Sequence, residues 1–345
     1  MDALKSRFTD KVTAAPDPAA VTALAAKLKS AGKKAGAEDR IDLAAMLAHA
    51  AFLSPDRVAQ IYDALATGWS GKEVTAAPIQ TLDEDPMPAP EGLWDAWWAV
   101  ASDAMAGQLD ASGITQRTAN LGGMMPEAFL ARLAELSYFY PGVRDASAAP
   151  MPEPIKLDTL AACPPNSLGR QFHDLIVDNK FDLEVLDREA LGLTQLPAPL
   201  EYLNTRMLQS HDLWHITAGY ETTALHEIAI SAFQMAQFGH NYSAQFLSIM
   251  AAIGARSDVR GFTMLTETIV TAWIHGRQTE PMLRIDWESE WVKPVDELRR
   301  EFAITPYKSP YPANIIEKGL AFQAFIAKIR GVFGGIFGRK PALQD

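Results

Sequence analysis

Apolar residues along most of this chain recur at intervals of three and four positions, and this spacing constrains the fold more than any other feature of the sequence. Such intervals place apolar side chains on one face of an α-helix, whereas a strand needs alternation at every second position. In the stretch 39–66, for example, Leu43, Leu47 and Ala50 fall on one stripe. No run carries the turn signals of a β-hairpin. The sequence therefore predicts an all-α fold, a multi-helix bundle with no significant sheet.

Two proline-rich runs, 76–92 and 141–165, interrupt this pattern, because proline cannot occupy the interior of a helix. Around them the spacing predicts helices at 17–32, 39–66, 92–107, 126–138 and 200–217, and a nearly continuous helical pattern over 166–304. We expect four parts: N-terminal helices over 1–68, a proline-rich loop with additional helices over 69–150, a core over 151–312 and an amphipathic segment over 313–345. One compact domain with an insertion near 69–125 and two separate domains both fit this pattern.

The composition excludes several classes of protein. The 345 residues carry a net charge of −11, which argues against nucleic acid as a partner because such binding needs a basic footprint. A single cysteine, Cys163, leaves no internal disulfide and no cysteine-cluster metal site. No stretch reaches the about 18 apolar residues that a membrane-spanning helix requires. The first residues lack the apolar core of a signal peptide and contain acidic residues, so we expect a cytoplasmic protein.

The most informative motif begins at His211, with Asp212 next to it and His215 four positions on. Residues at i and i+4 share one helix face, so the two imidazoles can reach one ion. Gly219 is a usual helix terminator and predicts a turn, after which Glu227 falls in the first turns of the next helix. Two histidines and a carboxylate form a standard divalent-metal set. Asp212 is either a fourth ligand or an acceptor that orients a histidine.

Other interpretations of these residues stay open at this point. A His-x-x-x-His pair also arises by chance in a long helical chain. Metalloproteases place a glutamate directly after the first histidine, where this chain has the shorter Asp212. His173 and Asp174 form a second His-Asp pair of the kind used by phosphohydrolases, but that class needs further ligands on other helices.

The motif His-Asp-x-x-His, eleven residues and Glu resembles the hallmark of the ubiquinone (coenzyme Q) biosynthesis protein Coq-four family. His211, Asp212, His215 and Glu227 fit that spacing. Three further segments resemble the family in the right order: the run PPNSLGRQF from Pro164, the run AWIHG from Ala272, and Trp287-Glu288 followed by PVDELRREFAI from Pro294. The likeness covers about 160–304 strongly and is weaker at 44–68.

This resemblance implies an all-helical protein bound peripherally to a membrane, with a polyprenyl chain in an apolar groove. It implies a divalent metal (Fe, Mn, Co or Zn) held by His211, His215 and Glu227, with Asp212 as ligand or orienting group in a catalytic role. The implied reaction removes the carboxyl group at ring carbon one of a polyprenylated hydroxybenzoate precursor and hydroxylates that carbon. Arg170 suits the substrate carboxylate, although a structural salt bridge is the simpler interpretation.

The segment Asn314–Lys340 differs from the acidic remainder of the chain. Its apolar and aromatic residues recur at helical spacing between lysines and arginines, which favours a helix lying on an anionic membrane surface. The alternative is a helix packed on the core or in a homodimer seam. Trp94, Trp97 and Trp98 lie at i, i+3 and i+4, a spacing typical of core packing, with an interfacial belt or a lipid groove as alternatives.

Taken together, the residues and the resemblance predict a metal-dependent enzyme of ubiquinone biosynthesis, an oxidative decarboxylase. Its expected partners are the polyprenylated quinone precursor, other ubiquinone biosynthesis enzymes and a membrane surface. The absence of a transit peptide suggests a bacterial protein, cytoplasmic and peripheral on the inner membrane. Two alternatives remain: a non-catalytic scaffold that binds the polyprenyl lipid, and a metal-dependent prenyl-phosphate hydrolase.

Overall fold

The computed structural model describes residues 3–151, 153–179 and 192–319, and these residues contain helices and no strand. One isolated bridge joins Ser167 to Pro294. The α-helices are α1 (Ala3–Val12), α2 (Pro18–Ala31), α3 (Ala37–Phe52), α4 (Val58–Ser70), α5 (Leu93–Met105), α6 (Ala111–Gly122), α7 (Glu127–Ser137), α8 (Val143–Ser147), α9 (Leu157–Ala161), α10 (Leu168–Asn179), α11 (Leu200–Ala218), α12 (Ala224–Phe238), α13 (Asn241–Arg256), α14 (Val259–Gln278) and α15 (Val295–Glu301). The predicted all-α fold is confirmed for this part of the chain.

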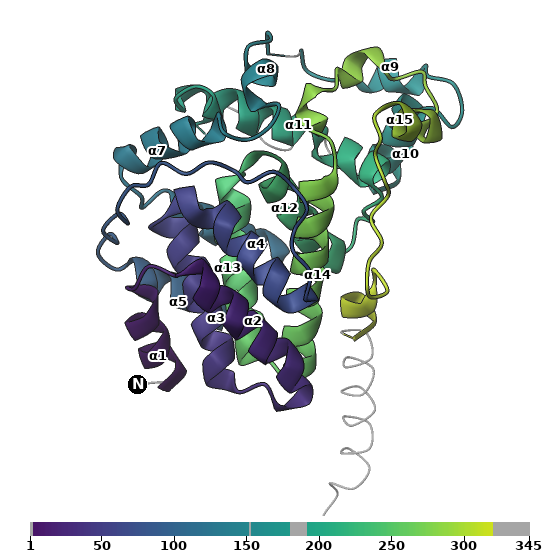
Figure 1. Ribbon diagram of the computed structural model, residues 1–345. Helices are drawn as coiled ribbons and strands as arrows, with labels where there is room; N and C mark the ends of the chain where they lie inside the picture. The colour runs from purple at the N-terminus through teal and green to yellow at the C-terminus, as the bar shows by residue number, and fades with distance from the viewer. Residues whose placement is uncertain (1–2, 152, 180–191, 320–345) are drawn as a thin grey trace, which may run out of the picture.

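A layered bundle forms the centre of the molecule (Figure 1). The helix α12 packs along α14, α13 packs along α3, and α2 packs along α4. Close contact between α12 and α14 depends on Gly276, because a Cβ there would lie 2.7 Å from both the Ala236 side chain and the Phe233 backbone. Mutual burial of the apolar helix faces therefore holds α12, which carries Glu227, against the largest helix of the bundle.

The predicted helix over 39–66 is wrong in its middle. The structure ends α3 at Phe52 and starts α4 at Val58, with a short 3₁₀ turn at Pro55–Arg57 between them. Pro55 has no backbone N–H and its ring disfavours a helical residue before it, so an uninterrupted helix cannot pass this point. The apolar pattern continues through the break because both helices bury side chains in the same core.

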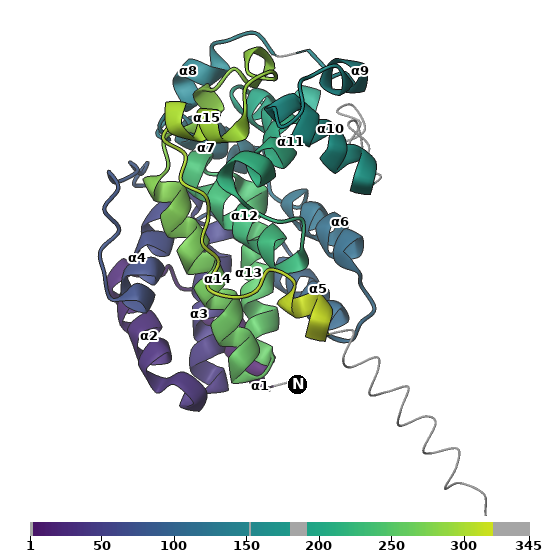
Figure 2. The same cartoon turned by 90° about the vertical axis from the view of Figure 1, so that its right-hand side faces the viewer.

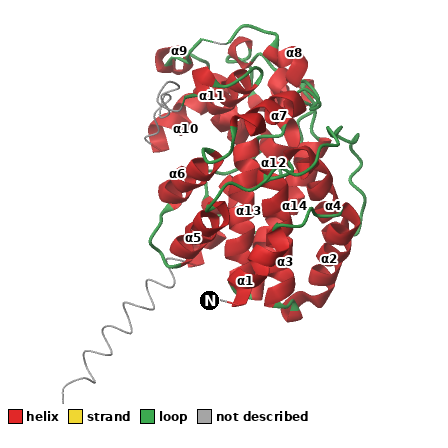
Figure 3. Cartoon of the chain, turned by 90° about the vertical axis from the view of Figure 1, so that its left-hand side faces the viewer, coloured by secondary structure: helices red, strands yellow, loops and turns green. Residues whose placement is uncertain are grey.

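The residues after α4 pack onto the bundle rather than away from it. The proline-rich run 76–92 contains no helix, as predicted, and is tied down where Met87 donates its N–H to the Leu53 carbonyl. Beyond it, α5 and α6 lie beside α13 (Figure 3). Trp97 of α5 is fully buried, stacks on Phe8 at 4.3 Å and donates its indole N–H to Ser248. The core interpretation of the tryptophans is thus confirmed for Trp97, while the four-part domain division stays a prediction.

A strap of chain follows α15 and runs down along α14 (Figure 2). Tyr307 donates its N–H to the Ala218 carbonyl at the end of α11, and Tyr311 donates its hydroxyl to Glu267 of α14. The strap ends where Glu317 accepts a hydrogen bond from the N–H of Ala224, the first residue of α12. The remaining amphipathic segment, from 320 onward, lies outside the described residues.

Candidate metal centre

The motif lies where α11 turns into α12, and we call this region, residues 211–227, the corner. Its shape follows from the local sequence. Helix α11 ends at Ala218, and Gly219 takes φ +78°, the left-handed conformation that glycine adopts without strain. Packing also disfavours a larger residue here, because a Cβ on Gly219 would lie 3.0 Å from the Pro306 side chain. Thr223 starts α12 in an extended conformation. The predicted stop and restart of the helix are therefore confirmed within a residue or two.

Three of the predicted ligands converge at this corner. The Nε2 atoms of His211 and His215 lie 3.1 Å apart, and the two Glu227 carboxylate oxygens lie 3.4 and 3.3 Å from them, respectively. All three ligand atoms fall within 4.8 Å of one another. Two atoms bound to one ion at about 2.0–2.1 Å and tetrahedral angles would stand about 3.3–3.4 Å apart. The spacing of the donor atoms thus fits a divalent metal.

The charges at the corner agree with this fit. Loss of solvent alone would raise the pKa of Glu227, yet hydrogen bonding and charge interaction with the two histidines hold its pKa well below the ordinary range. Burial alone would lower the pKa of His215, but Glu227 and, more weakly, Asp212 raise it above its ordinary value. Among the described residues, Glu227 pairs with these two histidines and with no lysine or arginine. The site therefore holds a carboxylate with room for a cation.

Hydrogen bonds to the Nδ1 atoms of His215 and His211 fix the orientation of the two rings. The Tyr220 carbonyl, 3.1 Å away, accepts the Nδ1–H of His215, so the His215 Nε2 atom faces Glu227 and His211. Tyr220 is itself held by stacking on Tyr307 at 4.5 Å and by its hydroxyl, 2.7 Å from Nδ1 of His275. On the other side, Gln234 of α12 contacts Nδ1 of His211 at 2.6 Å.

The other two predicted site residues lie outside this group. Asp212 is not among the converging ligand atoms, although its charge acts on His215. Arg170 sits on α10, where its Nε donates to Asp174 at 2.9 Å, and Asp174 also contacts His173 at 3.0 Å. The second His-Asp pair is therefore part of a local ion-pair cluster with Arg170, and Arg170 as a substrate-binding residue stays a prediction.

Sequence reasoning missed two groups that shape the corner. The Arg299 guanidinium donates to the carbonyls of Ile216 and Thr217, both at 2.9 Å, so it caps the end of α11 rather than lying on a solvated face. No sequence motif singled out Gln234, because glutamine is not part of the metal-binding motifs considered above. Its position seven residues after Glu227, on the same helix face, is the signal that could have found it.

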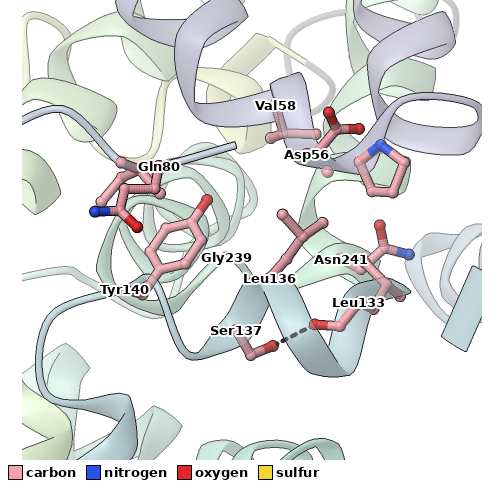
Figure 4. Close-up of a pocket in the computed structure, with 12 residues that line it drawn as sticks. Asp56, Val58, Gln80, Leu133, Leu136, Ser137, Tyr140, Gly239 and Asn241 are labelled. Carbon is pink, nitrogen blue, oxygen red and sulfur yellow. Dashed lines mark hydrogen bonds between the residues drawn. The ribbon is translucent and has the colours of Figure 1, made fainter. Parts of the chain in front are cut away.

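A cavity opens next to the buried histidine. It has a volume of about 290 Å³ and is lined by Leu175, His215, Ile216, Tyr220 and the turn 221–223. This volume lies at the lower limit of small-molecule sites, about 300 Å³, so the cavity has room for one aromatic ring but stays open to solvent. A second cavity lies between Asp56, Leu136, Tyr140 and Gly239 (Figure 4) and measures only about 20 Å³. That is room for one water, so it is no substrate site.

The described fold and site define an all-α protein with a two-histidine, one-carboxylate centre. Comparison with known proteins adds the family: residues 151–308 match the family model described as Coenzyme Q (ubiquinone) biosynthesis protein Coq4. The matched residues, slightly less than half of the chain, contain the motifs that predicted a resemblance to this family of ubiquinone biosynthesis.

Individual relatives match the same part of the chain. The ubiquinone biosynthesis protein COQ4 homolog 1, mitochondrial, of Culex quinquefasciatus is 26% identical over 156 residues, which are 44% of this chain and 52% of that protein. The Danio rerio homologue, also named mitochondrial, is 27% identical over 158 residues, 44% of this chain and 54% of its own. The chain spans about half the length of the curated relatives it matches. A solved structure from Nostoc punctiforme PCC 73102 is 22% identical, covering 61% of this chain and 98% of that one with a TM-score of 0.42.

The bacterial inner-membrane location predicted above is not supported, because the two curated relatives are named mitochondrial. Within residues 3–151, 153–179 and 192–319, no helix is both long and apolar enough to cross a membrane.

Proposed function

We propose that this protein is a metal-dependent enzyme of ubiquinone biosynthesis that acts on a polyprenylated hydroxybenzoate-type precursor. The observation that carries the proposal is the convergence of His211, His215 and Glu227 beside a cavity of about 290 Å³. The match of residues 151–308 to the Coq4 family supports the pathway. The precursor has a carboxylated phenolic ring and an apolar tail, which suit a cavity lined by both apolar and hydroxyl-bearing side chains.

The protein's own groups have separate tasks in this proposal. The two imidazoles and the Glu227 carboxylate would hold the metal, and Asp212 would place a further negative charge near His215. A bound Fe or Mn would supply open positions for O₂ and for the phenolic ring, whereas Zn or Co would act as a Lewis acid. Leu175, Ile216 and Tyr220 would orient the ring and exclude water from it.

The proposed reaction is oxidative decarboxylation with hydroxylation at ring carbon one. The bond from the ring to the carboxyl carbon breaks and CO₂ leaves, while one atom of O₂ becomes the new ring hydroxyl. A two-electron donor and two protons reduce the other oxygen atom to water. The electron-rich phenol favours this exchange because it stabilises positive charge at the carbon that is oxidised.

The polyprenyl tail makes a membrane surface the natural source of substrate, so we propose a peripheral location and contact with other ubiquinone biosynthesis enzymes. The alternative, in which the C-terminal segment packs between two subunits of a homodimer, is tested by measuring the molecular mass in solution. The predicted anchor at 320–340 lies outside the described residues and is tested by flotation with anionic vesicles.

The experiment compares aerobic and anaerobic incubation of the purified metal-loaded protein with precursor labelled with ¹³C at its carboxyl group. We expect labelled CO₂ and ring-hydroxylated product only with O₂ and a reductant, and loss of both in Glu227→Ala. Binding of the precursor without CO₂ release would overturn the enzyme and leave a lipid-binding scaffold. Release of phosphate from a prenyl phosphate under both atmospheres would instead show a hydrolase.

A further inference from the structure

Gln234 is a buried polar residue whose amide faces the candidate ligands. It lies on α12 two turns beyond Glu227 and keeps 3% of its surface exposed. Its Nε2 atom is 2.6 Å from Nδ1 of His211, the ring nitrogen that faces away from His215. A glutamine amide offers a donor and an acceptor on the same planar group, so it can serve a histidine in either tautomer.

The tautomer of His215 is fixed by its surroundings. The Tyr220 carbonyl can only accept, so Nδ1 of His215 must donate to it. In a neutral ring the Nε2 atom of His215 then carries a lone pair. That lone pair points at Nε2 of His211, 3.1 Å away.

The tautomer of His211 is not fixed in this way, and the structure gives one of its two arrangements. With the Gln234 amide N–H donating to Nδ1, a neutral His211 carries its proton on Nε2 and donates it to the lone pair of His215. Each ring nitrogen of His211 and His215 then has a hydrogen-bond partner without a metal. Metal binding needs a lone pair on Nε2 of His211, so the ring proton must sit on Nδ1.

We propose that Gln234 is a positioning residue for a metal ligand: its amide turns over by half a rotation, so that Oε1 accepts the Nδ1–H of His211 when a divalent metal binds. The amide thus supports the metal-free network in one orientation and the ligand tautomer in the other. This inference rests on the proposed function, because it requires that the corner binds a metal. It also explains why the position holds an amide, since an aliphatic side chain would serve neither state.

The test measures zinc affinity by competition with a chelator in three variants of the full chain. In Gln234→Met, a similar shape without hydrogen bonds, we expect affinity to fall about 10- to 100-fold, the usual effect of removing an outer partner of a ligand. In Gln234→Glu the carboxylate always accepts from Nδ1–H, so affinity is kept or increased. The matched control is Gln237→Met on the same helix, because Gln237 is equally buried but bonds to the carbonyls of Gly276 and Thr279.

A second readout is the ¹⁵N chemical shift of the His211 ring nitrogens, which reports the tautomer directly. We expect the proton on Nε2 in the metal-free protein and on Nδ1 in the zinc-bound protein, and on Nδ1 in metal-free Gln234→Glu. Equal zinc affinity in Gln234→Met and the wild type, or an unchanged tautomer in Gln234→Glu, would overturn the inference. If the wild type binds no zinc, the proposed metal function fails instead, and the metal-free tautomers still decide whether Gln234 controls His211.

Discussion

Two histidine–carboxylate clusters lie on neighbouring helices of this protein, and they differ in how the acid reaches the histidine. On α10, Asp174 directly follows His173 in the chain and lies four residues after Arg170, so a single helix supplies the whole cluster. At the corner of α11 and α12, the carboxylate comes from the next helix and meets two imidazoles. The first cluster forms wherever the helix forms, whereas the second requires the turn between two helices.

Charge balance separates the two clusters further. The Arg170 guanidinium lies against Asp174 and supplies the cation that the carboxylate needs. Both side chains keep more than 40% of their surface exposed, where ion pairs contribute little. His215 keeps 1% of its side chain exposed, whereas Glu227 is 46% exposed and faces two imidazoles where Asp174 faces an arginine. We therefore expect a metal at the corner and not at the α10 cluster, because the corner buries one histidine and, among the described residues, sets no arginine or lysine against its carboxylate.

The largest expected effect is on metal binding. His211→Ala and Glu227→Ala each remove a direct ligand, so zinc affinity should fall by more than about 100-fold, beyond the range for outer partners. His173→Ala, the matched change in the α10 cluster, should leave affinity unchanged. Elemental analysis after dialysis measures the occupancy. Full occupancy in both corner variants, or loss of metal in His173→Ala, would contradict the expectation that the corner binds the metal and the α10 cluster does not.

His240 shows the effect of burial on a histidine that has no carboxylate beside it. His240 is buried beside Ser243 with no carboxylate, and burial lowers its pKa to about 3. An unfolded histidine titrates near about 6.5, so unfolding takes up a proton between these values and stability falls as the pH falls. Between pH 7 and pH 4 this histidine should account for about 3 kcal/mol of lost stability. Urea unfolding of His240→Asn should show a shallower fall, and an identical pH profile would contradict the assignment.

The end of α11 provides a test of how the corner is held. Arg299→Met removes two charge-assisted hydrogen bonds to the carbonyls of Ile216 and Thr217 and should destabilise the protein by about 1–2 kcal/mol. Arg300→Met is the control, because the neighbouring side chain is exposed. Thermal unfolding compares them. Equal midpoints for the two variants would show that the cap contributes nothing.

The smallest effect should come from the α10 cluster itself. Asp174→Asn removes an exposed carboxylate whose pKa is lowered first by His173 and then by Arg170, and such surface pairs rarely change stability measurably. We expect the midpoint of urea unfolding to match that of the wild type. A clear loss of stability would show that proximity in the sequence can build a strong cluster without burial.

Much of the local structure could be read from the residues. Apolar spacing of three and four predicted most of the long helices, but not α6, nor the short α8 and α9 inside the proline-rich run 141–165. Gly219 marked the end of α11, and the interval of four between His211 and His215 placed both rings on one face. These features depend on contacts within a turn or two, which a sequence records directly. Where a single proline competed with a continuous apolar pattern, at Pro55, the pattern misled and one predicted helix became two.

The tertiary structure decided which of the predicted polar groups meet, and which others orient them. Glu227 reaches the histidines because Gly219 turns the chain and Gly276 lets α14 hold α12 close. Gln234, Tyr220 and Arg299 orient the corner through hydrogen bonds across helices. The sequence thus determined the helices and the spacing of the imidazoles, because helix geometry is local. Packing decided that the Glu227 carboxylate meets the two imidazoles and that the orienting side chains reach them. These contacts depend on the positions of separate helices relative to one another.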